Sequence, residues 1–292
     1  MSRRHQLINS AIQVLIHNRD GSFRTQNDRR SALLMSLKEL YDSGYQLNHV
    51  KYIQKRHIYA LVNGWLTQGI STGAMKNRVS HFRWMMQKLN IKDVIPSNDA
   101  LGIPKRVYIS NEDKSRHFAD IDFHKIDDTL MQLSLKGQQL FGLRVEESLK
   151  LQPYIADQGN SLYIKGSWAK GGRDRLILIR NEEQKKWIED CKKAVSSNKD
   201  SLIPTDTSYK TYRKRFEKRC ERAGISKLHG QRHYYAHQRY VEFTGFTCPV
   251  KGGPSWQDMS AEQRKLDRSA RLQISAELGH SRPNIVNSYC GR

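Results

Sequence analysis

The first hundred residues carry apolar side chains at the spacing of amphipathic helices. Apolar residues recur every three or four positions over 33–41, 58–66 and 75–89. This spacing predicts three helices, each with one buried face. Asn27 and Asp28 precede the first stripe, and either one is placed to cap its helix.

The pattern changes after residue 94. Two prolines and a glycine interrupt any period over 94–106, which predicts a linker and a domain boundary near residue 107. Helical periods then recur over 122–137, 143–151, 181–195, 207–223, 229–241, 268–279 and 283–289. Two short apolar runs, 161–165 and 175–179, flank a glycine-rich turn and predict a β-hairpin. We therefore predict a mostly α protein with a small β-sheet, in two domains, 1–107 and 108–292.

The charge of the chain points to a polyanionic partner. Its 292 residues include 50 Lys and Arg against 29 Asp and Glu, a net charge of +21. Residues 1–107 hold 17 basic and 6 acidic residues, which is +11, and residues 108–292 hold the remaining 33 and 23, which is +10. An excess shared by both halves predicts that both face the same nucleic acid.

Several other classes of protein do not fit. The longest apolar runs, such as 176–179, are far too short for a membrane span, and the first residues do not resemble a secretory signal. The four cysteines form no CxxC pair, which favours a reducing, cytoplasmic compartment over a disulfide framework or a zinc module. The sequence shows no acidic metal cluster and no GxxxxGK[ST] loop, so we predict neither a metal nor a cofactor.

Candidate chemistry lies in the second half, in a particular order. A Gly-Leu-Arg helix start, a hairpin lysine, an HxxR motif, a Leu-Gly-His motif and a tyrosine nine residues later follow one another. The residues concerned are Arg144, Lys170, His229, Arg232, His280 and Tyr289. Each motif alone is weak evidence, because arginines and tyrosines are common on surfaces and in cores. Their order and spacing carry the signal.

In this order the second half resembles the catalytic domain of the tyrosine recombinases, also called the phage integrase family. Glu147 matches an acidic position that is frequent there. The resemblance implies a helical, SAM-like core-binding domain over 1–107 and a catalytic domain over 108–292. It also implies cleavage and rejoining of DNA through a 3′-phosphotyrosine.

The residue types suit that chemistry. Arg144 and Arg232 can clamp one phosphate without a metal, because guanidinium groups stay charged and donate to two oxygens. Tyr289 would be the nucleophile. A phenol has a pKa near 10, so it needs a neighbouring base or cation. His229 would accept or steer its proton, and His280 would bind the phosphate or position the tyrosine.

The general acid in this scheme is a lysine. Lys170 would protonate the leaving 5′ oxygen from the hairpin tip, and Lys165 at the end of the first strand is the competing candidate. We prefer Lys170 because the pattern Lys-Gly-x-Arg-x-Arg-Leu fits the hairpin of the family best.

The family resemblance also implies partners. We expect double-stranded DNA at specific sites, a homotetramer on two synapsed duplexes, and an excision factor or a host DNA-bending protein in a bacterial, nucleoid-associated setting. Residues that fall on basic helix faces or beside the hairpin are expected to contact the DNA backbone. They are Lys76, Arg78, Arg83, Arg173, Arg213 and Lys214.

Two features depart from the family pattern. Arg232 and His280 are 48 residues apart, and the extra stretch, near 242–268, is either a loop that contacts DNA or a neighbour, or a surface insertion. Only three residues follow Tyr289, so coupling between protomers is expected to use another surface or a looser assembly. Cys290 beside the nucleophile suggests a redox switch, and the simpler interpretation is a small buried side chain.

Three functions remain in view. The leading one is integration or excision of a phage, a genomic island or another mobile element. A recombinase that resolves chromosome dimers, or a type IB topoisomerase, would use the same chemistry. A decayed recombinase would only bind DNA, and the intact motif set argues against it.

Overall fold

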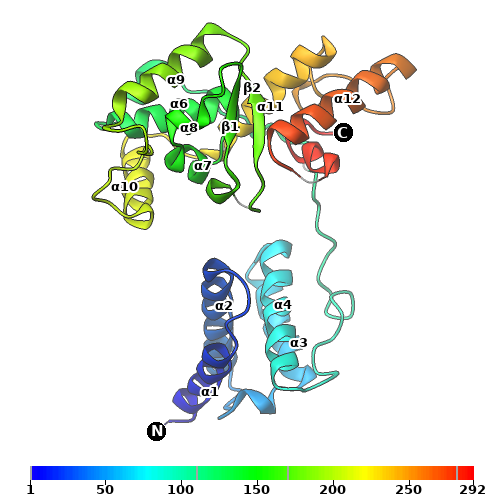
Figure 1. Ribbon diagram of the computed structural model, residues 1–292. Helices are drawn as coiled ribbons and strands as arrows, with labels where there is room; N and C mark the ends of the chain where they lie inside the picture. Colours follow the sequence, from blue (N-terminus) through cyan, green and yellow to red (C-terminus); the bar gives the residue numbers. More distant parts are fainter. Residues whose placement is uncertain (1, 110, 170, 281) are drawn as a thin grey trace. The chain divides into compact units, whose positions relative to one another are not determined.

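The chain folds into two compact units, Met1–Val107 and Tyr108–Arg292 (Figure 1). We describe each by itself, as a computed structural model that covers residues 2–109, 111–169, 171–280 and 282–292. The structure is mostly helical with one small antiparallel sheet, which confirms the predicted fold class. Within the described residues no helix is both long enough and apolar enough to cross a membrane.

The first unit is a small bundle of helices. Its elements are α1 (Arg3–His17), α2 (Phe23–Asp42), the 3₁₀ turn η1 (Val50–Tyr52), α3 (Lys55–Thr67) and α4 (Thr72–Lys88). Helix α2 packs against α1, α3 and α4 (Figure 1). The three predicted apolar stripes form the shared core, in which Leu37, Trp65 and Phe82 are almost completely buried.

The start of α2 differs from the prediction. Asn27 and Asp28 lie inside the helix, and Ser22 is its N-cap, with its Oγ accepting a hydrogen bond from the Thr25 backbone N–H at 3.2 Å. The predicted cap was wrong because the helix extends beyond its apolar stripe. A serine with extended backbone angles can satisfy an otherwise unpaired N–H wherever the helix begins.

The second unit surrounds one long buried helix. Its helices are α5 (Asp120–His124), α6 (Thr129–Phe141), α7 (Val145–Lys150), α8 (Pro153–Ala156), α9 (Glu182–Ala194), α10 (Tyr209–Arg222), α11 (His229–Thr244), α12 (Ala261–Glu277) and α13 (Asn287–Cys290), with 3₁₀ turns η2 (Gly166–Trp168), η3 (Pro249–Lys251) and η4 (Pro283–Val286). Helix α11 is buried over most of its length and packs against α6, α12 and α13 (Figure 1).

The helix predicted over 122–137 is in fact two helices. Helix α5 ends at His124, and α6 begins after Asp128, whose side chain accepts a hydrogen bond from the Met131 backbone N–H at 3.0 Å. An aspartate in this position ends the apolar period because it favours a helix start over a helix interior.

The predicted hairpin is present. Strands β1 (Ser161–Ile164) and β2 (Arg175–Leu178) pair antiparallel, with Tyr163 opposite Leu176. A Cβ at Gly166 would lie 2.6 Å from the Gly172 carbonyl oxygen, so this close approach of two backbone segments requires glycine. Lys170 lies outside the described residues.

The segment 242–268 is packed into the fold and is only partly a loop. It begins with the last turn of α11, passes through η3 and ends inside α12, whose N-cap is Ser260. Cys248 and Met259 are nearly completely buried, and Cys248 belongs to the same apolar cluster as Tyr289 and Cys290. The segment therefore supports the C-terminal residues of its own chain.

Candidate active site

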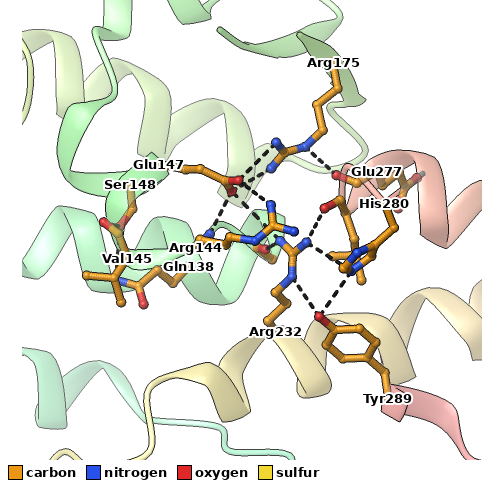
Figure 2. Close-up of polar contacts among 12 residues, drawn as sticks. Gln138, Arg144, Val145, Glu147, Ser148, Arg175, Arg232, Glu277, His280 and Tyr289 are labelled. Carbon is orange, nitrogen blue, oxygen red and sulfur yellow. Dashed lines mark hydrogen bonds and ion pairs between the residues drawn. The ribbon is translucent and has the colours of Figure 1, made fainter. Parts of the chain in front are cut away.

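The turn between α6 and α7 places the first arginine. Helix α6 ends at Gly142 in the left-handed region, with φ of +61°, and a Cβ there would lie 2.6 Å from the Tyr235 ring. Only glycine permits both the backbone angle and the close packing. The chain then turns so that Arg144 is the N-cap of α7, with its side chain directed toward Arg232 (Figure 2).

Glu147 is the negative centre of the site. It is completely buried and accepts hydrogen bonds from Arg144 Nη1 at 2.6 Å and Arg175 Nη2 at 2.7 Å, while Arg232 Nη1 lies 3.9 Å from it (Figure 2). Burial by itself would raise its pKa. The attraction of Arg175, Arg232 and Arg144 outweighs burial and lowers the pKa to about 2, so Glu147 is ionised at neutral pH.

Arg232 connects the elements of the site. It lies in α11 with 1% of its surface exposed, and it donates to the backbone carbonyls of Gly142 and Leu278. Its Nε lies 3.3 Å from the Tyr289 hydroxyl, and its Nη2 lies 3.5 Å from His280 Nε2. Burial lowers its pKa to about 10, which leaves the guanidinium charged at neutral pH.

The candidate nucleophile faces two of the predicted partners. The Tyr289 hydroxyl lies 3.2 Å from His280 Nε2 (Figure 2). The backbone N–H of His280 donates to the Ser275 carbonyl at 2.9 Å. Burial and the nearby Arg232 and Arg144 lower the pKa of His280 to about 3. The imidazole is therefore neutral near pH 7, and its Nε2 can accept a hydrogen bond from the phenol.

His229 contacts the ring of Tyr289, with 5.8 Å between ring centroids. Burial, together with Arg232 and Arg144, lowers its pKa. Among the hydrogen bonds of the described residues, His280 and Arg232 reach the phenol oxygen. The proton acceptor that this geometry favours is therefore His280, whereas His229 is placed beside the ring.

Two further histidines of α11 also contact the candidate nucleophile. The His233 ring lies 4.6 Å from the Tyr289 ring, and His237 Nε2 lies 2.8 Å from the Tyr289 carbonyl oxygen. Their four-residue spacing from His229 puts all three on one helix face, which is the signal that could have linked them to the site.

Arg175 is the main participant that we did not predict. It lies at the start of β2, donates to both oxygens of Glu147, and donates from Nε to the Glu277 carbonyl at 2.8 Å. The sequence places it within the pattern Lys-Gly-x-Arg-x-Arg-Leu. Its side chain is 7% exposed, and it links the hairpin to α12.

The structure thus brings together Arg144, His229, Arg232, His280 and Tyr289, which come from four separate stretches of chain. Lys170 is outside the described residues. The competing Lys165 lies directly after β1, and its side chain is exposed.

The predicted DNA contacts differ in how strongly they bind their own chain. Arg78 pairs with Glu39 at 3.5 Å, and Arg83 donates to the Pro96 carbonyl at 2.8 Å. Arg213 donates to Glu217 at 2.9 Å. Lys76 is half-buried, while Arg173 and Lys214 are exposed. DNA contact by these six residues stays a prediction.

The arrangement is suited to an anionic, tetrahedral ligand. Two charged guanidinium groups, one of them buried, converge beside a phenol hydroxyl and a neutral imidazole. Cations held in place before a reaction stabilise the charge that develops on a phosphate under attack. A phenol and an imidazole are groups that can serve as the nucleophile and the proton acceptor in such an attack.

Known proteins share this architecture. The profile of the family described as phage integrase, N-terminal, matches residues 5–92. No curated protein sequence is significantly similar to the chain. A lambda integrase dimer bound to a COC′ core site is 16% identical, with a TM-score of 0.57, covering 95% of this chain and 93% of that one.

Two other solved structures are also similar to this chain. The XerH site-specific recombinase bound to its difH substrate is 16% identical with a TM-score of 0.53, covering 97% of this chain and 80% of that one. The Tn1549 transposon integrase in complex with transposon right end DNA is 12% identical with a TM-score of 0.52, covering 100% of this chain and 96% of that one. The predicted resemblance is confirmed: the chain has the tyrosine recombinase fold, with a phage integrase N-terminal domain matched over residues 5–92.

Proposed function

We propose that this protein is a site-specific DNA recombinase that cuts and rejoins strands through a 3′-phosphotyrosine. The observation that carries the proposal is the Tyr289 hydroxyl, which lies within 3.3 Å of both Arg232 Nε and His280 Nε2. A tyrosine that only packs in a core has no need of a buried cation and a neutral base at its oxygen.

The chemistry follows from these positions. The Tyr289 oxygen attacks the phosphorus of the scissile phosphodiester, and its proton passes to His280. Arg144 and Arg232 neutralise the non-bridging oxygens as negative charge develops on them. The bond from phosphorus to the 5′ oxygen breaks, and Lys170, by resemblance, protonates that oxygen.

The same steps in reverse rejoin the strand. A 5′ hydroxyl attacks the phosphotyrosine and displaces the Tyr289 oxygen, which recovers a proton from His280. The covalent bond conserves the energy of the broken phosphodiester, so rejoining needs no nucleotide cofactor.

Double-stranded DNA is the proposed partner. The lambda integrase, XerH and Tn1549 integrase structures are complexes with DNA, and the net charge of +21 suits the same partner here. We propose a homotetramer on two synapsed duplexes in the cytoplasm, acting with an excision factor or a DNA-bending protein. The phage integrase N-terminal match favours integration or excision of a mobile element.

The test is a covalent adduct on a denaturing gel. The substrate is a nicked duplex that carries the junctions flanking the gene's own element. Cleavage next to the nick releases a short fragment that bears the free 5′ hydroxyl. This fragment diffuses away, so the strand cannot be rejoined and the covalent intermediate accumulates. Wild type should form an adduct, and Tyr289→Phe should form none while keeping its salt-sensitive DNA binding. The matched control is Tyr154→Phe, which alters an exposed tyrosine of the same unit and should react like wild type.

Two results would count against the proposal. An adduct that persists in Tyr289→Phe would place the nucleophile elsewhere. DNA binding without any adduct from wild type would favour a protein that only binds DNA.

A further inference from the structure

An arginine outside the phosphate-binding group holds the segment that carries the candidate nucleophile. Arg271, in α12, donates from Nη1 to the Asn287 side-chain oxygen at 2.9 Å and to the Gly291 carbonyl at 2.9 Å. These acceptors lie two residues before and two residues after Tyr289. One guanidinium therefore binds both ends of the short helix α13.

Arg271 is itself fixed in position. It is 8% exposed, and its Nε donates to Asp267 at 2.7 Å one turn earlier in α12. Asp267 is 2% exposed and accepts a hydrogen bond from the Tyr240 hydroxyl at 2.6 Å. The guanidinium is thus held by buried residues of two long helices, Tyr240 of α11 through Asp267 of α12.

Helix α13 needs such support. It spans only Asn287–Cys290, which is much too short to be stable by helix propensity alone. Its C-cap Gly291 has a φ of +74°, and its backbone N–H bonds to the Asn287 carbonyl at 3.0 Å. The position of the phenol therefore depends on tertiary contacts, which include those at the two ends of this single turn and the one from His237 to the Tyr289 carbonyl oxygen.

We propose that Arg271 is a positioning residue for strand cleavage, acting through Asn287 and Gly291 to hold Tyr289 against Arg232 and His280. This inference rests on the proposed function and names a further residue that this function needs. Arg271 is not given a phosphate contact in this scheme, because its Nε and Nη1 already donate to Asp267, Asn287 and Gly291. Its Nη1 donates to Asn287 and Gly291 while its Nε donates to Asp267, and a lysine ammonium cannot match this fixed planar arrangement of donors.

The experiment measures single-turnover adduct formation on the nicked duplex at saturating DNA. Two quantities are read: the rate constant and the final amount of adduct per protein. Arg271→Ala should lower the rate constant about 10²-fold, the effect expected from misplacing a reacting group by about 1 Å. The final amount of adduct and the DNA affinity should match wild type, and Arg271→Lys should fall between the two.

Two further variants sharpen the test. Arg268→Ala removes the same charge from the same helix, at an exposed residue that stacks on Trp256 at 5.1 Å, and should react at the wild-type rate. Asn287→Ala removes one acceptor and should slow cleavage less than Arg271→Ala. Combining it with Arg271→Ala should add little, because both changes remove the same contact.

The outcomes separate positioning from folding. A reduced final amount of adduct with an unchanged rate constant would show that Arg271 only helps the chain to fold, and would overturn the proposal. Wild-type values for both quantities in Arg271→Ala would overturn it as well. If Arg271→Ala does not fold, Arg271→Lys and Asn287→Ala decide by the same two readings. A wild-type chain without any adduct would instead refute the proposed function and this inference with it.

Discussion

Replacing Glu147 by glutamine should destabilise the C-terminal unit by about 3 kcal/mol at pH 7. This carboxylate is completely buried among Arg144, Arg175 and Arg232. Its pKa falls from 4.5 to about 2, and each tenfold change in proton affinity is worth about 1.4 kcal/mol. The difference between folded and unfolded chain therefore amounts to about 3 kcal/mol. Removal of one partner from a buried ion pair typically costs about 3–5 kcal/mol, which agrees.

The sign of the pH dependence follows from the lowered pKa. The folded chain binds the Glu147 proton more weakly than the unfolded chain does. The stabilisation is therefore fully present above about pH 4.5 and is lost as the pH falls toward 2. Glu147→Gln should lack this part of the pH dependence.

The chain offers a selective assay. All four cysteines, Cys191, Cys220, Cys248 and Cys290, lie in the C-terminal unit and are buried. The rate at which 4,4′-dithiodipyridine labels these thiols in urea reports unfolding of that unit alone, and this reagent still reacts at low pH. The matched control is Glu146→Gln, which breaks a partly exposed pair with Lys150 and should cost under about 1 kcal/mol.

The result that would refute the reasoning is a Glu147→Gln variant within about 1 kcal/mol of wild type at pH 7. A Glu147→Gln variant that still loses as much stability as wild type between pH 4.5 and 2 would also refute it. Either outcome would mean that the positions of the three arginines do not depend on this carboxylate.

Two other predictions concern the same region. Gly142→Ala should cost more than about 2 kcal/mol, because a Cβ would lie 2.6 Å from the Tyr235 ring at a φ of +61°. Gly159→Ala, with a φ of +72° and open space around its Cβ, should cost only about 1 kcal/mol, and similar losses for both in thiol labelling would contradict the packing argument. The imidazole of His280, whose pKa is lowered to about 3, should show no protonation in NMR spectra between pH 8 and 5, and a midpoint near 6.5 would refute its burial beside Arg232 and Arg144.

The spacing of apolar residues along the chain explains how far the helices and the hairpin could be predicted from sequence. Apolar period predicts a helix wherever one face is buried, and so α9, α10 and α11 begin within two residues of the predicted starts, 181, 207 and 229. It does not locate helix ends that lack apolar residues, which is why Ser22 was missed as a cap. It also could not divide 122–137, where the apolar spacing continues across the break at Asp128.

The residues of the candidate site could also be chosen from the sequence, because the order of their motifs is specific. Sequence identified Arg144, His229, Arg232, His280 and Tyr289 without showing which of them touch. The structure decides that His280 and Arg232 reach the phenol oxygen and that His229 lies beside its ring.

The supporting residues could be recognised only in three dimensions. Arg175 and Arg271 are two among 50 basic residues, and nothing adjacent to them in the chain marks them as buried. Their roles depend on partners that are distant in sequence: Glu147 is 28 residues from Arg175, and Gly291 is 20 residues from Arg271. An arginine on a surface and an arginine that fixes a nucleophile have the same side chain, and only the tertiary fold, by removing water and supplying acceptors, makes them different.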